Sequence, residues 1–326
     1  MNDFRIVASC AGGPEVLASQ SIEPEAPGPG EVRIRQRAVG VNFVDIYHRT
    51  GLYGGTYPAP LGAEAAGVIE AVGLGVEDLK VGDRVAYGTG SHGAYATVRL
   101  MPAEHVFRLP DAISDEAAAA IILKGMTVAY LAGPCARVEP GQTVLVHAAA
   151  GGVGSILVPW LKALGARVIA HVGSSAKAKR VEALGADTVL SCGFGELAGA
   201  VRSLTAGDGA HVVFDGVGAA SWTASMGATA ACGLLVTYGN ASGPVPPFTA
   251  LDLMRAGSIF VTRPTLRDYA PNRQKRQALA EALFTRFTKG DIPLSIDRRL
   301  ALADVAEAHR ALEARQTAGA IILLPE

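Results

Sequence analysis

Hydrophobic and polar positions alternate in the first third of the chain as they do in half-buried strands. Within Glu31–Val41, the apolar Val32 and Ile34 alternate with Arg33 and Arg35, which is the period of two of a strand with one buried face. Glycine-bounded apolar runs predict further strands at residues 65–72, 83–87 and 95–100. Helices and strands do not alternate regularly here, so we predict a β-rich, barrel-like or mixed domain.

The pattern changes near residue 114. An alanine-rich helix is expected over Asp115–Tyr130, with Ser114 as its N-cap. Apolar strands and helical segments then alternate. The predicted strands are 144–147, 167–172, 188–191, 211–215, 234–238 and 258–261, and the predicted helices are 155–164, 176–184, 194–203 and 222–229. This alternation predicts a doubly wound parallel sheet.

After residue 263 the alternation stops. Two helices are expected over residues 272–289 and 302–314, and a closing strand over 320–324. These elements are too few to fold alone, so we expect them to complete the first domain. The predicted fold class is α/β, with a first domain of residues 1–124 and 266–326 and a dinucleotide-binding domain of residues 125–265.

A glycine-rich motif opens the second domain. Residues 143–155 read TVLVHAAAGGVGS, which is a β-branched run, a glycine-rich turn and the start of an apolar helix. The turn fits Ala149-x-Gly151-x-x-Gly154, a variant of the dinucleotide fingerprint with alanine first. Backbone N–H groups at a helix N-terminus favour a pyrophosphate. We expect the cofactor to contact the loop residues Ala150, Gly151, Gly152 and Val153.

The segment after the next strand indicates which dinucleotide binds. NAD sites usually carry an acidic residue here, whereas this chain has Gly173, Ser174 and Ser175, followed by Lys177. Hydroxyl groups and cations suit a ribose 2′-phosphate, so we predict NADPH and expect these four residues to bind it. The alternative is that the cations are solvated charges on the next helix.

Two later strand ends offer further candidates. Asp215 closes the fourth strand and could bind a ligand or cap the following helix. Tyr238, Gly239 and Asn240 end the fifth strand, and the glycine would let the backbone approach the nicotinamide half of the cofactor. A plain turn is the alternative for this segment.

Charge and cysteine content exclude several classes of protein. With 29 Lys+Arg and 30 Asp+Glu the net charge is −1, so no basic field favours nucleic acid. The four scattered cysteines form no Cys-x-x-Cys pair, which argues against a structural zinc site or a disulfide framework and fits a cytoplasmic protein. The uncharged runs 141–161 and 216–251 contain glycine and proline, so neither predicts a membrane span.

Several motifs together resemble the zeta-crystallin-like quinone oxidoreductases, the zinc-free branch of the medium-chain dehydrogenase/reductase superfamily. Besides the glycine-rich loop, they are residues 12–17, 40–45, 51–53, 61–67, 123–127 and 261–264. The resemblance runs from residue 4 to the C-terminus. It implies a GroES-like catalytic domain completed by the C-terminal segment, a Rossmann cofactor domain and a homodimer.

The resemblance also implies a site without metal. Gly62-Ala63-Glu64 stands where zinc-dependent relatives carry Gly-His-Glu, and alanine cannot bind a metal. The ligand cysteine that precedes the aspartate in those relatives is absent before Asp45. Without zinc, alcohol oxidation loses the Lewis acid that would stabilise an alkoxide. Reduction of an electrophilic acceptor is therefore the better hypothesis.

Site residues follow from the same resemblance. Asn42 is expected to position the acceptor, Tyr47 to donate a hydrogen bond to it and Tyr53 to line its pocket. Lys124 and Thr127 match positions near the cofactor. The alternatives are a turn-forming amide for Asn42, a rim aromatic for Tyr47, a mobile loop around Tyr53 and an exposed helix lysine for Lys124.

Some residues depart from the family pattern or have no assigned role. Ser191-Cys192 stands where similar proteins often have Asn-Tyr beside the 2′-phosphate, so that part of the NADPH site is expected to differ. His48, His92 and His147 have no obvious partner in the sequence. His92 lies in a glycine-rich loop, where a histidine is usually solvated.

Three functions are consistent with these features. The first is NADPH-dependent reduction of quinones by hydride transfer, without metal, and the second is NADPH-dependent reduction of alkenals or enones. The third is a non-catalytic NADPH-binding protein with a structural or RNA-binding role. The near-zero charge argues against RNA, and the intact loop with Asn42 and Tyr47 argues against a non-catalytic protein.

Overall fold

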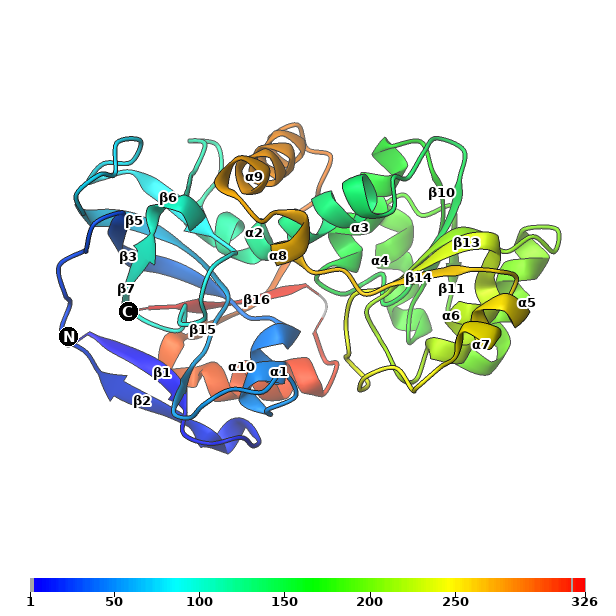
Figure 1. Ribbon diagram of the computed structural model, residues 1–326, viewed down its shortest axis with the longest axis horizontal. Helices are drawn as coiled ribbons and strands as arrows, with labels where there is room; N and C mark the ends of the chain where they lie inside the picture. Colours follow the sequence, from blue (N-terminus) through cyan, green and yellow to red (C-terminus); the bar gives the residue numbers. More distant parts are fainter. Residues whose placement is uncertain (1–2, 318, 326) are drawn as a thin grey trace. The chain divides into compact units, whose positions relative to one another are not determined.

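The chain forms two compact units in the computed structural model, which describes residues 3–317 and 319–325. Unit 1 comprises residues 1–126, 272–288 and 294–326, and unit 2 comprises residues 127–271 and 289–293. The chain builds most of unit 1, then unit 2, and returns to unit 1 with its C-terminal segment (Figure 1).

Unit 2 is built on a six-stranded parallel sheet, as the alternating pattern predicted. Its order is β11-β10-β9-β12-β13-β14. The strands are β9 (Thr143–Val146), β10 (Arg167–His171), β11 (Thr188–Leu190), β12 (Ala210–Asp215), β13 (Thr229–Thr237) and β14 (Phe260–Thr262). This is the 3-2-1-4-5-6 order of dinucleotide-binding folds, with the topological switch point at the carboxyl ends of β9 and β12.

Helices cover both faces of this sheet. In Figure 1, α3 (Gly154–Ala163) and α4 (Ala178–Ala183) lie on one side, and α5 (Phe194–Leu204) and α6 (Trp222–Ala228) lie on the other. The core between α5, α6 and the sheet contains fully buried Leu145, Val213 and Leu235. The central strands β9, β10 and β12 are almost entirely buried, which explains why they read as apolar runs.

Unit 1 is β-rich, as predicted. Its larger sheet has the order β15-β16-β3-β5-β6-β8, and β7 also pairs with β3. These strands are β3 (Glu31–Gly40), β5 (Glu64–Val72), β6 (Arg84–Tyr87), β7 (Val98–Pro102), β8 (Phe107–Arg108), β15 (Ile296–Ala301) and β16 (Ala320–Leu324). A smaller sheet joins β1 (Phe4–Ala8), β2 (Leu17–Ser21) and β4 (Ala59–Pro60).

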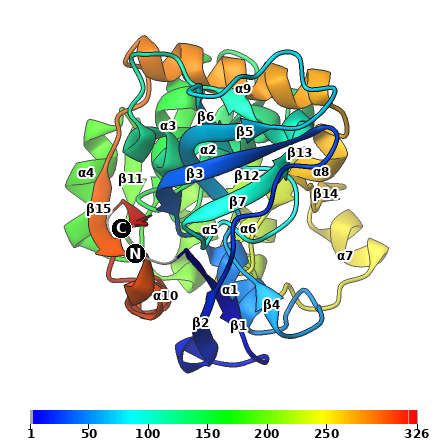
Figure 2. The same cartoon turned by 90° about the vertical axis from the view of Figure 1, so that its left-hand side faces the viewer.

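The C-terminal segment is an integral part of unit 1. Strand β16 pairs with β3, with Ile322 opposite Gly40. Hydrogen bonds from Arg49 to His309 and Glu313 join α1 (Phe43–Arg49) to α10 (Val305–Glu313). Helix α9 (Arg273–Thr288) lies at the opposite end of this unit from β1 and β2 (Figure 2). Helix α2 (Asp115–Tyr130) leads from unit 1 into unit 2.

Several predicted bounds need correction. Helix α2 has the predicted bounds, and Ser114 Oγ accepts the Ala117 N–H at 3.2 Å as its cap. The strand predicted at 95–100 begins only at Val98, because the Tyr95 N–H bonds Leu61 O outside the β3–β7 ladder. The helix predicted over 176–184 is a 3₁₀ turn (Ser175–Lys177) followed by α4.

One helical stretch, Asp115–Cys135, is long and apolar enough to cross a membrane by length and composition. However, 72% of its most apolar window is buried inside the protein. Burial of this extent is the property of a core helix, so the stretch gives little support to a membrane span.

Candidate active site

Asn42 stands at the start of α1. Its backbone N–H donates to Asp45 Oδ2 at 2.8 Å, which is the N3-to-N-cap half of a capping box. Its side-chain Nδ2 donates to Glu64 Oε1 on β5, also at 2.8 Å, and the residue is 8% exposed. The Asn42 amide is therefore held in one orientation by Glu64.

Glu64 is the centre of a buried polar cluster. Lys124 Nζ lies 2.5 Å from Glu64 Oε1, and the Leu123 N–H donates to Glu64 Oε2 at 2.8 Å. Glu64 is fully buried and Lys124 is 6% exposed, so the alternative of an exposed lysine is wrong. The sequence analysis named Glu64 only as part of a lost zinc motif. The available signal was a carboxylate directly before the apolar run of residues 65–69.

This cluster does not fit a metal ion. A metal at Glu64 would have to displace an ammonium group, an amide and a backbone N–H from its two oxygens. The neighbouring Ala63 offers no ligand atom. Across residues 3–317 and 319–325, no three His, Cys, Asp or Glu side chains gather as a metal-binding group.

The structure brings Tyr47 and Tyr53 together. Their ring centroids are 5.2 Å apart in an edge-to-face contact, and Tyr47 is 8% exposed whereas Tyr53 is 44% exposed. Tyr47 also lies 6.2 Å from Phe43 on the same helix. The rings of His48 and His92, which showed no partner in the sequence, are in contact in a tilted arrangement, with centroids 3.9 Å apart.

A series of buried hydrogen bonds connects α1 with α10. Arg49 Nη1 lies 3.0 Å from His309 Nδ1, and His309 Nε2 lies 2.9 Å from the Tyr95 hydroxyl. Because a guanidinium only donates, Nδ1 accepts and the ring proton is on Nε2. Tyr95 then donates to Asp45 Oδ2 at 3.0 Å. This series of hydrogen bonds therefore links α10 to Asp45, whose carboxylate accepts the backbone N–H of Asn42.

Acid is expected to destabilise unit 1 through His309. Burial, and then the charge of Arg49, lowers the pKa of His309 to about 3, whereas an unfolded histidine titrates near pH ~6.5. Since the folded pKa is the lower one, this contribution to stability is complete above about pH 6.5 and is lost as the pH falls towards 3. Between about pH 6.5 and 5 the loss is roughly 2 kcal/mol.

Denaturant unfolding at several pH values measures this loss, and His309→Gln should show a shallower fall in the free energy of unfolding. Burial raises the pKa of Asp45 to about 7, so its contribution is lost as pH rises and has the opposite sign. The Asp45 contribution is present in the parent protein and in His309→Gln. The difference between their free energies of unfolding therefore reports the contribution of His309. Equal slopes would show that His309 does not carry the effect.

The glycine-rich loop has the geometry of an anion cradle. A Cβ on Gly154 would lie 2.5 Å from Ala148 O and 2.6 Å from Ala149 Cα, so only glycine lets α3 begin this close to β9. Ala148 has a positive φ of 49°, which turns the loop. Within the described residues, no backbone carbonyl accepts from Gly152 or Val153 N–H, and both groups stand at the positive end of α3.

The end of β10 presents the predicted 2′-phosphate residues. Gly173, Ser174 and Ser175 are exposed, and Lys177 is partly buried on the 3₁₀ turn. Strands β9 and β10 pair in parallel, so this segment and the glycine-rich loop lie at the same edge of the sheet. His171 Nε2 lies 3.0 Å from Cys192 O, which ties the end of β10 to the segment after β11.

Asp215 is committed to internal contacts. Its Oδ1 accepts the N–H groups of Val217 and Gly218 at 2.8 and 3.2 Å. Its Oδ2 accepts the hydroxyls of Ser221 and Ser225 at 2.6 and 2.5 Å, and Ser225 Oγ also lies 3.0 Å from His147 Nε2. Asp215 thus anchors the start of α6, as the cap alternative suggested, and His147 does have a partner.

Other predicted cofactor residues lie on unit 2. Tyr238 and Asn240 are partly buried at the carboxyl end of β13, and Thr127 is partly buried on α2. A Cβ on Gly239 would lie 2.4 Å from Gly216 O. This glycine is therefore required for the close approach of the segments after β12 and β13, whether or not a ligand also approaches it.

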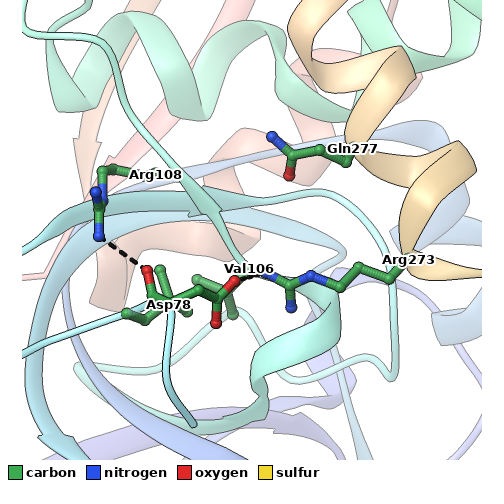
Figure 3. Close-up of a pocket in the computed structure, with 6 residues that line it drawn as sticks. Asp78, Val106, Arg108, Arg273 and Gln277 are labelled. Atoms are coloured by element: carbon green, nitrogen blue, oxygen red, sulfur yellow. Dashed lines mark hydrogen bonds and ion pairs between the residues drawn. The ribbon is translucent and has the colours of Figure 1, made fainter.

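A surface pocket of about 290 Å³ lies elsewhere on unit 1 (Figure 3). It is lined by Asp78, Leu79, Val106, Arg108, Arg273 and Gln277. Its arginines are paired, Arg108 with Asp83 at 2.8 Å and Arg273 with Asp78. None of the predicted site residues lines it, so it has no part in the candidate active site.

Two family models match the chain. The alcohol dehydrogenase GroES-like domain matches residues 28–111, and the zinc-binding dehydrogenase family matches residues 152–283. Together with the strand order of unit 2, these matches define the class of protein as a medium-chain dehydrogenase/reductase. They confirm the predicted α/β class with GroES-like and Rossmann parts.

Comparison with similar proteins identifies the family within this class. A quinone oxidoreductase of Pseudomonas aeruginosa is 46% identical over 98% of this chain and 99% of that one. The Escherichia coli quinone oxidoreductase complexed with NADPH is 39% identical, with a TM-score of 0.95 and coverage of 99% and 100%. A 2-haloacrylate reductase of a Burkholderia species is 40% identical over 97% of each chain. The chain belongs to the quinone oxidoreductase family, as the motifs indicated.

Proposed function

We propose that this chain reduces quinones with NADPH by hydride transfer, without a metal. The observation that carries the proposal is the carboxyl edge of the unit 2 sheet. There a glycine-rich loop lies beside a turn with two serines and a lysine, and no acidic residue occupies the usual NAD position. The similar quinone oxidoreductases, one solved with NADPH, support it.

The residues of unit 2 fit the cofactor. Gly154 is needed where the loop meets the helix. The N–H groups of Gly152 and Val153, which donate to no backbone carbonyl of the described residues, suit a pyrophosphate. Ala150 and Gly151 would line the same loop, and Gly173, Ser174, Ser175 and Lys177 would hold the 2′-phosphate. Thr127, Tyr238, Gly239 and Asn240 would contact the nicotinamide half. NADPH, when bound, supplies the hydride.

Residues of unit 1 would prepare the acceptor. The Asn42 amide donates one N–H to Glu64, and its second N–H would donate to a carbonyl oxygen of the acceptor. Tyr47 would donate to the oxygen that gains charge, and Tyr53 would cover the ring. Lys124 would act through Glu64, since its ammonium group holds the carboxylate that orients Asn42.

Reduction of enones is the second candidate, because a 2-haloacrylate reductase is 40% identical to the chain. NADPH consumption with p-benzoquinone and with methyl vinyl ketone separates the two activities. We expect the higher kcat/KM with the quinone. A preference for the enone would replace the first candidate by the second, and consumption with neither would leave a non-catalytic NADPH-binding protein.

Cofactor preference should depend on Lys177. In the variant Lys177→Glu, kcat/KM for NADPH is expected to fall about tenfold to a hundredfold, because a carboxylate would face the dianionic 2′-phosphate. The value for NADH should change by less than about threefold, since it lacks this group. Steady-state kinetics with both cofactors measure the ratio. Lys275→Glu, an exposed change on α9, is the control, and equal losses for both cofactors would contradict the assignment.

We also propose that the enzyme is a cytoplasmic homodimer joined through unit 2. Strand β14 ends the strand order of the described sheet, and an unpaired edge can pair with a second copy. Large apolar side chains are exposed beside it: Phe260 is 65% exposed on β14, and Leu251 and Met254 on α7 (Ala250–Arg255) are 55% and 57% exposed. The four cysteines are free thiols, in keeping with a reducing compartment.

The variant Phe260→Lys tests this interface. Loss of a central aromatic anchor should weaken association by about 2 kcal/mol or more, so the variant should sediment as a monomer at concentrations where the parent protein is a dimer. Leu74→Lys is the matched control, because Leu74 is 82% exposed on unit 1. If the Phe260 variant remained dimeric, the β14 edge would not be the interface.

A further inference from the structure

Two histidines of unit 1 lie beside the proposed acceptor residues. The rings of His48 and His92 are in contact, with centroids 3.9 Å apart and planes inclined by 49°. His48 follows Tyr47 on α1, and its ring meets Tyr53 at 5.6 Å and 82°. Tyr53 in turn meets Tyr47 at 5.2 Å. These four rings form one continuous group, which we call the histidine–tyrosine cluster.

The loop that carries His92 is fixed from inside the protein. Arg99 on β7 donates from Nη2 to the carbonyls of Ser91 and His92 at 2.5 and 3.1 Å. Arg99 is 9% exposed, and its guanidinium lies 5.0 Å from the ring centroid of Tyr87. A buried cation that binds two successive carbonyls holds the loop in one conformation. His92 therefore occupies a defined position, as a recognition residue must.

The ring of His92 has unused hydrogen-bonding capacity. His92 Nδ1 is buried, and no described residue bonds it. An unpaired buried polar atom costs free energy, so its presence requires an explanation such as ligand binding. Burial lowers the pKa of His92 to about 4 and lowers the pKa of His48 as well. At neutral pH each ring is uncharged and carries one N–H donor.

We propose that the His48–His92 pair recognises the second carbonyl oxygen of a quinone and so makes the chain select quinones over acceptors with one carbonyl. This inference rests on the proposed function and assigns specificity within it. Aromatic rings suit the flat face of a quinone, and an uncharged N–H suits a carbonyl oxygen in an apolar site. His48 and His92 are then specificity-determining residues beside Asn42 and Tyr47.

Hydrogen-bond donation from the His48–His92 pair should increase the rate of quinone reduction. The quinone takes up a hydride, which is two electrons and one hydrogen nucleus, and one proton from solvent, so that hydroquinone and NADP⁺ result. Before the proton arrives, conjugation places negative charge on a carbonyl oxygen. A donor at the second oxygen stabilises that charge more than it stabilises the neutral quinone. An enone has a single carbonyl oxygen and has no group for this donor.

Phenylalanine substitutions test the pair, because they keep a ring in place and remove the N–H groups. We expect His48→Phe and His92→Phe each to lower kcat/KM for p-benzoquinone about tenfold to a hundredfold. The value for methyl vinyl ketone should change by less than about threefold, because that acceptor leaves the pair unused. His92→Gln keeps a donor and should recover part of the loss for the quinone.

The control is His105→Gln, because its ring nitrogens already face Thr89 Oγ1 at 2.9 Å and Glu104 Oε1 at 3.6 Å. It should leave both activities near those of the parent. Equal losses for both acceptors, or no loss for the quinone, would overturn the inference while the parent still reduced quinones. A parent protein that reduced no quinone would overturn the proposed function instead, and the inference with it.

Discussion

The variant Glu64→Leu is expected to lose about 3–5 kcal/mol of folding free energy, because it leaves the buried Lys124 ammonium without its carboxylate. Lys124 is 6% exposed and lies 2.5 Å from Glu64, so water cannot replace the lost partner at low cost. The Asn42 amide loses the same partner, so quinone reduction should fall as well. Urea unfolding at neutral pH measures the change in stability.

Glu70→Leu on the same strand is the matched control. Glu70 pairs with Arg33 and Arg35, but all three side chains are 24–34% exposed, and such pairs contribute less than about 1 kcal/mol. The double variant Glu64→Leu, Lys124→Leu removes both charges, so it should regain most of the stability and stay impaired in activity. A loss below about 1 kcal/mol for Glu64→Leu would contradict the buried ion pair.

The variant Gly154→Val is expected to weaken NADPH binding at least about a hundredfold, or about 2.7 kcal/mol. Its Cβ would lie 2.5 Å from Ala148 O and 2.6 Å from Ala149 Cα. Both are backbone atoms and cannot turn away as a flexible side chain can. The start of α3 must therefore shift, and the N–H groups of the cradle shift with it. Calorimetric titration with NADPH measures the affinity.

Gly199→Ala is the control for this change. Gly199 lies within α5, and a Cβ there would meet nothing within 4 Å. Alanine is the better helix former by roughly 1 kcal/mol, so this variant should bind NADPH normally and be slightly more stable. Unchanged NADPH affinity in Gly154→Val would show that the glycine-rich loop does not hold the cofactor.

The sequence predicted unit 2 well because its central strands β9, β10 and β12 are almost entirely buried. Strands such as β9 (TVLV) stand out as apolar runs between glycine-rich turns, and their alternation with helical segments predicted a doubly wound parallel sheet. The start of α2 followed from one local signal, the hydroxyl of Ser114. Apolar runs, turns and helix caps depend on residues close together in the chain, so the local sequence was sufficient to predict them.

Short and half-buried elements of unit 1 were missed. Strand β15 reads IDRRLA, and its two adjacent arginines hide the alternation of a strand at the end of the sheet. Helix α1 has seven residues, too few to show a helical period. Its start depends on the Asp45 carboxylate, which accepts the Asn42 N–H. Only the packed sheet and α10 make such a short helix stable.

The contacts between side chains of the candidate site could not be predicted from the sequence. Glu64 and Lys124 are 60 positions apart and meet only when β5 packs against α2. Likewise, His48 on α1 meets His92 only because Arg99 fixes the loop of His92. The local pattern gave the residue types, but their partners, burial and pKa shifts depend on tertiary packing.

The most direct test of the account is the stoichiometry of p-benzoquinone reduction by protein treated exhaustively with a metal chelator. A metal-independent NADPH:quinone reductase should consume one NADPH for each hydroquinone formed, at the rate of the untreated protein, because hydride transfer carries both electrons. Failure to consume NADPH with the quinone would contradict this function. A rate lost to the chelator and restored by zinc would contradict it equally.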